Sequence, residues 1–222
     1  MGRMLVVYES MFGNTERIAR AVGEGLASAA IGPDGPVVEV VEVGEAPDRV
    51  EGDVTLLVAG GPTHAFGLSR PSTRRDAEKS ADGPLVSSGR GLREWLTTLE
   101  AEGTPPVAVF DTRMGRPAFL KLTPHGSRVA VKLLRGRGLP ASLGTDHFWV
   151  TDTTGPLVEG EDASAGGRRR GRVRRGAGGR GRRGRGRCGR RRRHRGRPRR
   201  GHDRRRPLAP ARGRRLAVVA AR

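Results

Sequence analysis

Short apolar runs alternate with amphipathic stretches along most of the chain, and this alternation limits the folds that it can adopt. Five segments have the apolar, β-branched character of strands: residues 4–8, 37–43, 54–59, 106–110 and 148–150. Apolar residues recur at helical spacing in three more segments: 16–29, 91–99 and 127–137. Trp95, in a predicted helix, and Trp149, in a predicted strand, are expected in the core. Strands that alternate with helices indicate an α/β fold with a doubly wound, parallel, five-stranded sheet. In such a sheet, ligands bind beyond the carboxyl ends of the strands.

The charge of the chain changes abruptly near residue 162. Residues 163–222 hold 26 Arg and one acid, Asp203, for a net charge of +25, whereas residues 1–162 hold 17 basic and 22 acidic residues, for −5. The first part is long enough for one domain with a full core. The second part is rich in Arg and Gly, lacks aromatic residues and cannot form a core. We therefore expect a folded domain over 1–162 and a disordered tail over 163–222.

Several classes of protein are excluded by composition. A single cysteine, Cys188, excludes an internal disulfide framework and a Cys-based zinc site, and favours a reducing cytoplasm. His125 and His147 have no metal-ligand neighbours at helical spacing, so no metal site is expected. No run reaches the ~20 apolar residues of a membrane span, and the N-terminus fits no signal peptide. We expect a cytoplasmic protein without membrane contact, whose chemistry comes from a cofactor.

The turn after the first apolar run has the composition of an anion-binding loop. It reads Ser10-Met11-Phe12-Gly13-Asn14-Thr15 and leads into a helix. Unpaired N–H groups and the positive end of the helix dipole attract anions at such a position. The turn has no Lys or Arg, and it is neither a Walker loop nor a G-x-G-x-x-G turn. The alternative interpretation is an ordinary strand-turn-helix corner with a Thr or Asn cap.

The pattern aromatic-x-Ser-x-x-Gly-x-Thr-x-x-x-Ala is matched by Tyr8, Ser10, Gly13, Thr15 and Ala19. It resembles the phosphate loop of the flavodoxin family. The resemblance extends over roughly residues 4–161 and implies a flavodoxin-like sheet that binds flavin mononucleotide (FMN). The residues implied to hold the FMN phosphate are Ser10, Met11, Phe12, Gly13, Asn14 and Thr15. Many family members have Thr at the two positions after the Ser, so here those positions offer only backbone N–H groups.

A second loop, rich in Gly, Pro and Ser, follows the 54–59 run and is expected to extend over about residues 60–89. It contains Gly61-Pro62-Thr63-His64. The resemblance implies that Pro62, Thr63, His64 and Phe66 frame the isoalloxazine ring, with His64 or Phe66 covering one of its faces. A planar π-face against the ring would add about 0.5–1.5 kcal/mol beyond burial. The alternatives are a solvent-facing His64 and a Phe66 that fills space under the loop.

A third loop is expected after the 106–110 run. By the same resemblance, Thr112, Arg113 and Met114 complete the frame of the ring. Thr112 would bind its pyrimidine edge, and Arg113 would offset the negative charge of the reduced flavin. The alternative for Arg113 is a solvated surface charge.

These residues favour an FMN-binding electron carrier that works with a redox partner protein or a small-molecule acceptor. A flavin-dependent quinone or porphyrinogen oxidoreductase is an alternative within redox chemistry, so whether the chain is an enzyme stays open. A nucleic-acid-binding protein is the alternative from another class, because the arginine tail can bind polyanions non-specifically.

The expected final helix of the fold does not follow the last strand. Gly155–Glu161 is a plausible approach to a helix, but no amphipathic segment comes after it. The tail consists mainly of Arg, Gly, Ala and Pro, the four residues whose codons begin with two G/C bases. We infer that the reading frame changes within 161–166. The final helix would then be missing or replaced, and the tail would be a frameshift product.

Translation of the gene in the other two frames from this point tests the inference. One frame should give a helix rich in Glu, Ala and Leu, followed by a stop codon within about 20–25 residues. If neither frame does so, the tail belongs to the gene as it is written.

Overall fold

The computed structural model describes residues 2–30, 32, 35–64, 67–114 and 125–167. Five parallel strands form its main sheet: β1 (Arg3–Tyr8), β2 (Val37–Glu42), β4 (Val54–Pro62), β6 (Val107–Met114) and β7 (Gly144–Val150). Their order is β2-β1-β4-β6-β7. This is the flavodoxin-like order of a doubly wound sheet. The direction in which successive strands are added to the sheet reverses between β1 and its neighbour β4. The predicted fold class is confirmed.

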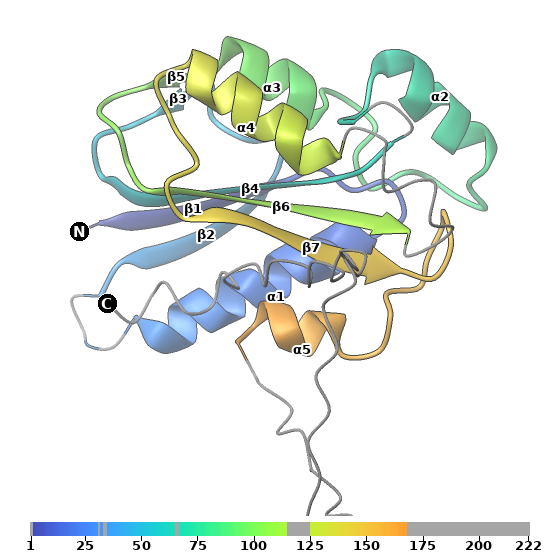
Figure 1. Cartoon of the computed structure of the whole chain (residues 1–222), viewed down its shortest axis with the longest axis horizontal. Helices are drawn as coiled ribbons and strands as arrows, with labels where there is room; N and C mark the ends of the chain where they lie inside the picture. Colours follow the sequence, from blue (N-terminus) through green and yellow to red (C-terminus); the bar gives the residue numbers. More distant parts are fainter. Residues whose placement is uncertain (1, 31, 33–34, 65–66, 115–124, 168–222) are drawn as a thin grey trace, which may run out of the picture. The chain divides into compact units, whose positions relative to one another are not determined.

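Helices cover both faces of the sheet (Figure 1). On one face lie α1 (Asn14–Ala29) and α5 (Glu161–Ala165), and on the other lie α3 (Leu92–Thr98) and α4 (Gly126–Gly136). A second, two-stranded sheet pairs β3 (Arg49–Val50) with β5 (Glu100–Ala101). No helix of the described residues is long and apolar enough to cross a membrane.

The core has two layers because successive side chains of a strand point to opposite faces. On β1, Leu5 and Val7 pack with Trp95 of α3, while Val6 and Tyr8 pack with Ile18 of α1. The central strands are buried on both faces, which explains why they appear in the sequence as continuous apolar runs.

The region between residues 60 and 89 was expected to be one long loop, and this is wrong. It contains helix α2 (Pro71–Lys79), in which no residue is buried. A helix without an apolar stripe gives no periodic signal. Pro71 occupies its first turn, and the hydroxyl of Thr73 accepts a hydrogen bond from the Arg70 N–H at 2.9 Å. The third loop also starts later than expected, because residues 111–114 continue strand β6.

A short helix follows the last strand, at the place where the final helix was expected to be missing or replaced. Helix α5 runs from Glu161 to Ala165 and packs against α1. Ala165 is buried in the same core layer as Ile18, and Asp162 pairs with Arg17 at 2.9 Å. The change of composition thus begins just where this five-residue helix ends.

The aromatic ring of Phe110 lies directly over Gly60. The two residues are register partners on β6 and β4, and a Cβ atom built on Gly60 would lie 2.0–2.5 Å from three ring atoms. Phe110 is itself fixed by an edge-on contact with Phe148, at a centroid distance of 5.8 Å. The strand end that leads into the second loop therefore depends on the absence of a side chain at residue 60.

Substitution Gly60→Ala should lower the free energy of unfolding by about 1–3 kcal/mol, the usual cost of overpacking a core. Gly136→Ala is the matched control, since a Cβ atom there meets nothing within 4 Å. Urea denaturation of both variants measures the difference. Equal stability of the two would show that the Phe110 ring moves aside freely.

Candidate functional site at the carboxyl ends of β1, β4 and β6

The first loop, residues 9–13, joins β1 to α1 at the carboxyl edge of the sheet. Gly13 adopts a left-handed conformation (φ +80°) directly before α1, and no side chain of the described residues caps that helix. The N–H groups of its first turn therefore have no acceptor within the helix. Ser10 is fully buried, and its hydroxyl has no hydrogen-bond partner among the described residues. Loop and helix end thus present donors without acceptors.

A strap formed by residues 85–88 holds this loop in place. The Ser87 N–H donates to the Ser10 carbonyl at 2.8 Å, and the Val86 N–H donates to the Met11 carbonyl at 3.1 Å. The Ser10 N–H donates to the Ser87 hydroxyl at 2.9 Å, and that hydroxyl donates to Glu42. The backbone at Ser10 and Met11 is therefore fixed before any ligand arrives.

Thr15 and Thr112 come together across the edge of the sheet. Both side chains are buried, and their hydroxyl oxygens lie 2.7 Å apart. Asn14 donates from its amide to the Thr154 carbonyl at 2.9 Å. Because side chains alternate along β6, Thr112 points to the α1 face. Thr112, which was expected at the flavin ring, therefore lies next to Thr15, which was expected at the phosphate.

The second loop closes tightly at residues 64 and 67. The His64 N–H donates to the Gly67 carbonyl at 2.8 Å, and the Gly67 N–H donates back at 3.1 Å. Burial lowers the pKa of His64, and the nearby Arg74 charge lowers it further. The Nε2 atom of His64 is buried without a partner among the described residues. Thr63 is engaged elsewhere, since its hydroxyl accepts the Gly126 N–H at 3.0 Å.

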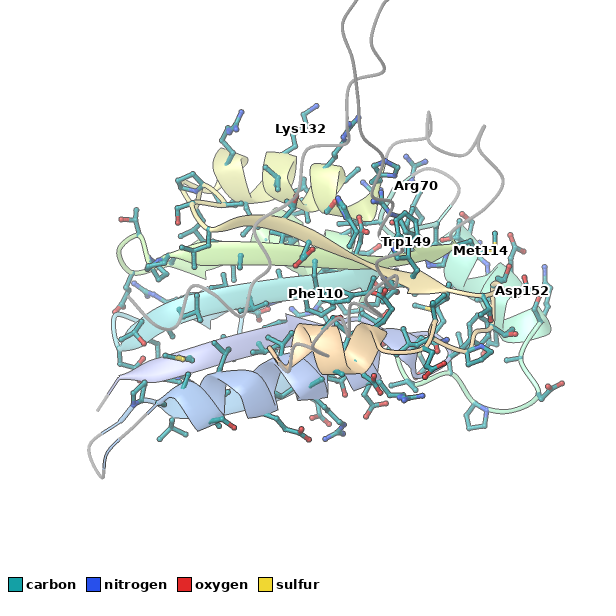
Figure 2. All side chains as sticks on the ribbon, turned by 60° about the horizontal axis from the view of Figure 1, so that its bottom comes forward. Arg70, Phe110, Met114, Lys132, Trp149 and Asp152 are labelled. Atoms are coloured by element: carbon teal, nitrogen blue, oxygen red, sulfur yellow. The ribbon has the colours of Figure 1, made fainter. Side chains whose placement is uncertain are left out.

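Residues 111–114 send their side chains alternately to the two faces of the sheet. Arg113 points to the α4 face, where its guanidinium carbon lies 4.6 Å from the centroid of the Trp149 ring. Met114, on the opposite face, accepts a weak hydrogen bond from the Thr153 hydroxyl at 3.7 Å. Trp149 was expected in the core but is only half-buried, and it lies beside the carboxyl end of β6 (Figure 2).

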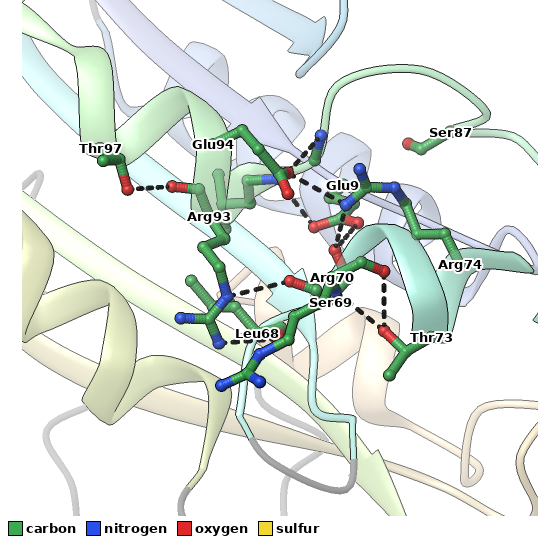
Figure 3. Close-up of polar contacts among 12 residues, drawn as sticks. Glu9, Leu68, Ser69, Arg70, Thr73, Arg74, Ser87, Arg93, Glu94 and Thr97 are labelled. Carbon is green, nitrogen blue, oxygen red and sulfur yellow. Dashed lines mark hydrogen bonds and ion pairs between the residues drawn. The ribbon is translucent and has the colours of Figure 1, made fainter.

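A buried carboxylate joins the first loop to the second (Figure 3). Glu9 is fully buried; it accepts hydrogen bonds from the Ser69 hydroxyl and, at 2.9 Å, from the Leu92 N–H. Arg74 completes the network by donating to the Ser69 hydroxyl and to Glu94, both at 3.0 Å. Burial raises the pKa of Glu9, although these donors and the Arg74 charge oppose the rise.

A carboxylate–histidine pair lies on the α4 face of β6 and β7, and the sequence did not predict it. Asp111 is fully buried and accepts hydrogen bonds from His147 Nδ1 at 2.9 Å and from the Ser127 N–H at 3.0 Å. Burial alone would raise the pKa of Asp111, but the hydrogen bond and charge of His147 and the N–H of Ser127 hold it below its ordinary value. Asp111 and His147 are register partners, 36 residues apart in sequence.

The three loops are therefore brought to one edge of the sheet. Of the residues expected to bind the cofactor, Phe66 lies outside the described residues. The others are positioned by β1, β4 and β6 or by the turns that follow these strands: Ser10, Met11, Phe12, Gly13, Asn14, Thr15, Pro62, Thr63, His64, Thr112, Arg113 and Met114.

Strand order, helix layers and the loops at the carboxyl edge define a flavodoxin-like α/β protein. No protein-family model matches the chain, and no curated protein matches it. Among solved structures, flavodoxin 1 of Bacillus cereus aligns with 14% identity over 75% of this chain and 93% of its own, at a TM-score of 0.48. Flavodoxin 2 of the same organism aligns with 20% identity over 74% and 92%, at 0.43.

A two-electron-reduced flavodoxin from Megasphaera elsdenii aligns with 17% identity over 73% of this chain and 95% of its own, at a TM-score of 0.42. The strand order β2-β1-β4-β6-β7 makes the chain flavodoxin-like in fold, as predicted from its loop sequences.

The raised pKa of Glu9 predicts how the stability of the domain changes with pH. A group whose pKa is higher in the folded than in the unfolded state stabilises the folded protein, and this contribution is complete below the unfolded pKa, which is about 4.3 for Glu. The contribution is lost as the pH rises through the folded pKa. The stability of the wild type relative to Glu9→Gln should therefore fall as pH rises above about 4.3. Urea denaturation across this range measures it.

Glu78→Gln, which changes an exposed carboxylate on the surface of α2, is the control for the substitution itself. A difference for Glu9→Gln that stays constant, or that grows with pH, would contradict the assignment.

Proposed function

We propose that the domain over residues 1–162 binds FMN without a covalent bond and transfers electrons through it. One observation carries the proposal. Among the described residues, five buried side-chain nitrogen or oxygen atoms lack a hydrogen-bond partner, and three of them belong to residues expected at the cofactor: Ser10 Oγ, His64 Nε2 and Arg113 Nε. Buried polar atoms are nearly always paired in folded proteins, so such a concentration supports a ligand that supplies the partners.

The first loop fits a phosphate group. The N–H groups at the start of α1 and the Ser10 hydroxyl offer hydrogen bonds without prior acceptors. The paired hydroxyls of Thr15 and Thr112 border the same helix end. No cation lies in the loop, so the phosphate would be held by donors and by the helix dipole.

The second and third loops fit the edges of a planar ring. His64 is half-buried with a buried Nε2 atom, and its lowered pKa favours the neutral ring, which can exchange a hydrogen bond with a polar ring atom without adding charge. Met114 contributes an exposed apolar side chain at the end of β6. When bound, FMN would supply the redox chemistry, and this chain would supply its binding and orientation.

The counterpart in electron transfer would be a redox protein or a small-molecule acceptor. Residues 163–222 would add non-specific attraction to polyanions, because of their +25 charge. The frameshift origin of this tail stays a proposal.

The phosphate loop is tested by two substitutions that each remove one hydroxyl, Ser10→Ala and Thr15→Val. A hydrogen bond to a charged group contributes about 1.5–3 kcal/mol, so each should weaken FMN binding by about 10–100-fold. Riboflavin, which lacks the phosphate, should bind all variants with similar affinity. Titration of flavin fluorescence with the full-length chain measures both ligands, and the tail is the same in every variant.

The matched control is Ser28→Ala, which removes an exposed hydroxyl at the other end of α1. It should leave the FMN affinity unchanged. The proposal fails if the wild type does not bind FMN, or if all three substitutions have the same effect.

A further inference from the structure

Four arginines from four different elements gather on the α4 side of the carboxyl edge, around the second and third loops. Arg70 directly precedes α2, Arg93 lies on α3, Arg113 lies near the end of β6, and Arg128 is in the first turn of α4. We call this set the arginine edge. It is brought together by the fold, because its members are spread over 59 residues of sequence.

Arg93 connects the end of the second loop with the start of α4. Its Nε atom donates to the Ser69 carbonyl at 3.1 Å, and its Nη2 atom donates to the Leu68 carbonyl at 2.9 Å (Figure 3). A Cβ atom built on Gly67 would lie 3.8 Å from the same Nη2 atom and 2.6 Å from the side chain of Val129. The Arg93 guanidinium therefore lies where the second loop, α3 and the first turn of α4 meet.

The charges of the arginine edge act on one another. Burial lowers the pKa of Arg93, and the charge of Arg70 lowers it further, although the carboxylates of the network in Figure 3 oppose this. Burial also lowers the pKa of Arg113; the Asp111 charge opposes the fall, and the Arg128 charge adds to it. The four guanidinium groups thus form one region of positive potential.

The described residues leave most of this charge without a partner. Arg70 and Arg128 are exposed, and neither they nor Arg93 form an ion pair within the part of the chain that the structure describes. Arg113 faces Asp111 at 3.8 Å, but that carboxylate already accepts two hydrogen bonds.

The other residues of the chain bring little negative charge. Residues 65–66 and 115–124 contain no Asp or Glu, and the remaining undescribed residues contain only Asp34 and Asp203. Residues 1–162 have a net charge of −5, so the arginine edge is a local exception on an acidic domain. Its counter-charge has to come from outside the chain.

The side chains beside the arginines are typical of a protein interface. Arg70, Met114 and Trp149 lie at the same end of the sheet (Figure 2). Met114 is 36% exposed, and Trp149 is half-buried under the Arg113 guanidinium. Arg, Met and Trp are enriched in protein interfaces. Because Arg113 occupies a face of the Trp149 ring, that face does not offer the open platform on which nucleic-acid bases stack.

We propose that the arginine edge docks the acidic surface of a redox partner protein. The inference rests on the proposed function, because the edge borders the second and third loops, which would frame the flavin ring. Guanidinium groups form paired hydrogen bonds with carboxylates, so Arg70 and Arg128 bind the partner's Asp and Glu side chains. Met114 provides an apolar contact between them and the ring. Positive potential confined to one edge of an acidic domain also orients the partner before contact.

A first experiment needs no cofactor. The soluble haem domain of cytochrome b5, an acidic protein, is added to the flavin-free full chain, and ¹H–¹⁵N resonances are recorded. The indole resonance of Trp149 and the backbone resonances of residues 67–70 and Arg128 should shift. The indole of Trp95, which is buried and bonded to the Pro47 carbonyl, is the internal control and should not shift. Shifts confined to residues 168–222 would overturn the proposal.

A second experiment compares two double charge reversals at exposed positions. Arg70→Glu with Arg128→Glu changes the arginine edge, and Arg135→Glu with Arg137→Glu makes the same change of charge at the other end of α4. The dithionite-reduced, FMN-loaded full chain is mixed rapidly with cytochrome b5, whose haem iron takes up one electron from the flavin and goes from Fe(III) to Fe(II). The first pair should slow this transfer by about tenfold at low ionic strength, and the second should change it little. High salt should remove the difference.

The same variants with cytochrome c, a basic protein, should not be slowed by reversal of the arginine edge. Equal effects of the two double variants on cytochrome b5 would overturn the proposal. So would an oligothymidylate that shifts the Trp149 indole as cytochrome b5 does, because the edge would then bind any polyanion. Failure of the wild type to bind FMN would reject the proposed function, whereas the resonance shifts in the flavin-free chain would still decide whether the edge docks an acidic protein.

Discussion

The arrangement of the loops depends on one buried carboxylate. Glu9 directly follows strand β1, begins the first loop, and accepts hydrogen bonds from Ser69 beyond the second loop and from the start of α3. A buried carboxylate is costly unless its hydrogen bonds are satisfied, and Arg74 provides a charge that is itself held by Ser69 and Glu94. The two loops therefore cannot separate without exposing Glu9 or leaving it without its hydrogen-bond partners. The geometry of the edge is thus set by the folding of the domain and exists before any ligand binds.

Successive side chains of β6 leave opposite faces of the sheet at that edge and therefore contact different residues. Asp111 and Arg113 point towards α4, and Thr112 and Met114 point towards α1. The first pair meets His147 and Trp149, while Thr112 meets Thr15. A single extended segment thus presents Thr112 to the proposed phosphate loop and holds the Asp111–His147 pair on its other face. A shift of one residue in the register of β6 would exchange the two sets.

Local patterns in the sequence predicted the five strands, the flanking helices α1, α3 and α4, and the loop after β1. These features depend on apolar periodicity and on residue types within a few positions of one another. Helix α2 was not predicted because it buries no apolar stripe, and β3 and β5 were not predicted because two residues carry no periodicity. The Asp111–His147 pair depends on the register between two strands, which one sequence does not reveal. Trp149 appeared to belong to the core because nothing in its local sequence shows that β7 is an edge strand.

The central claim is that the loop at residues 10–15 receives the phosphate of FMN. The most direct measurement is the change in backbone ¹H–¹⁵N resonances of the full chain when FMN is added. The largest shifts should fall on residues 10–15 and on Thr112, and riboflavin should leave the resonances of the first loop nearly unchanged. Shifts confined to the arginine-rich residues 168–222 would show that FMN binds only as an anion on a polycation, and would contradict the claim.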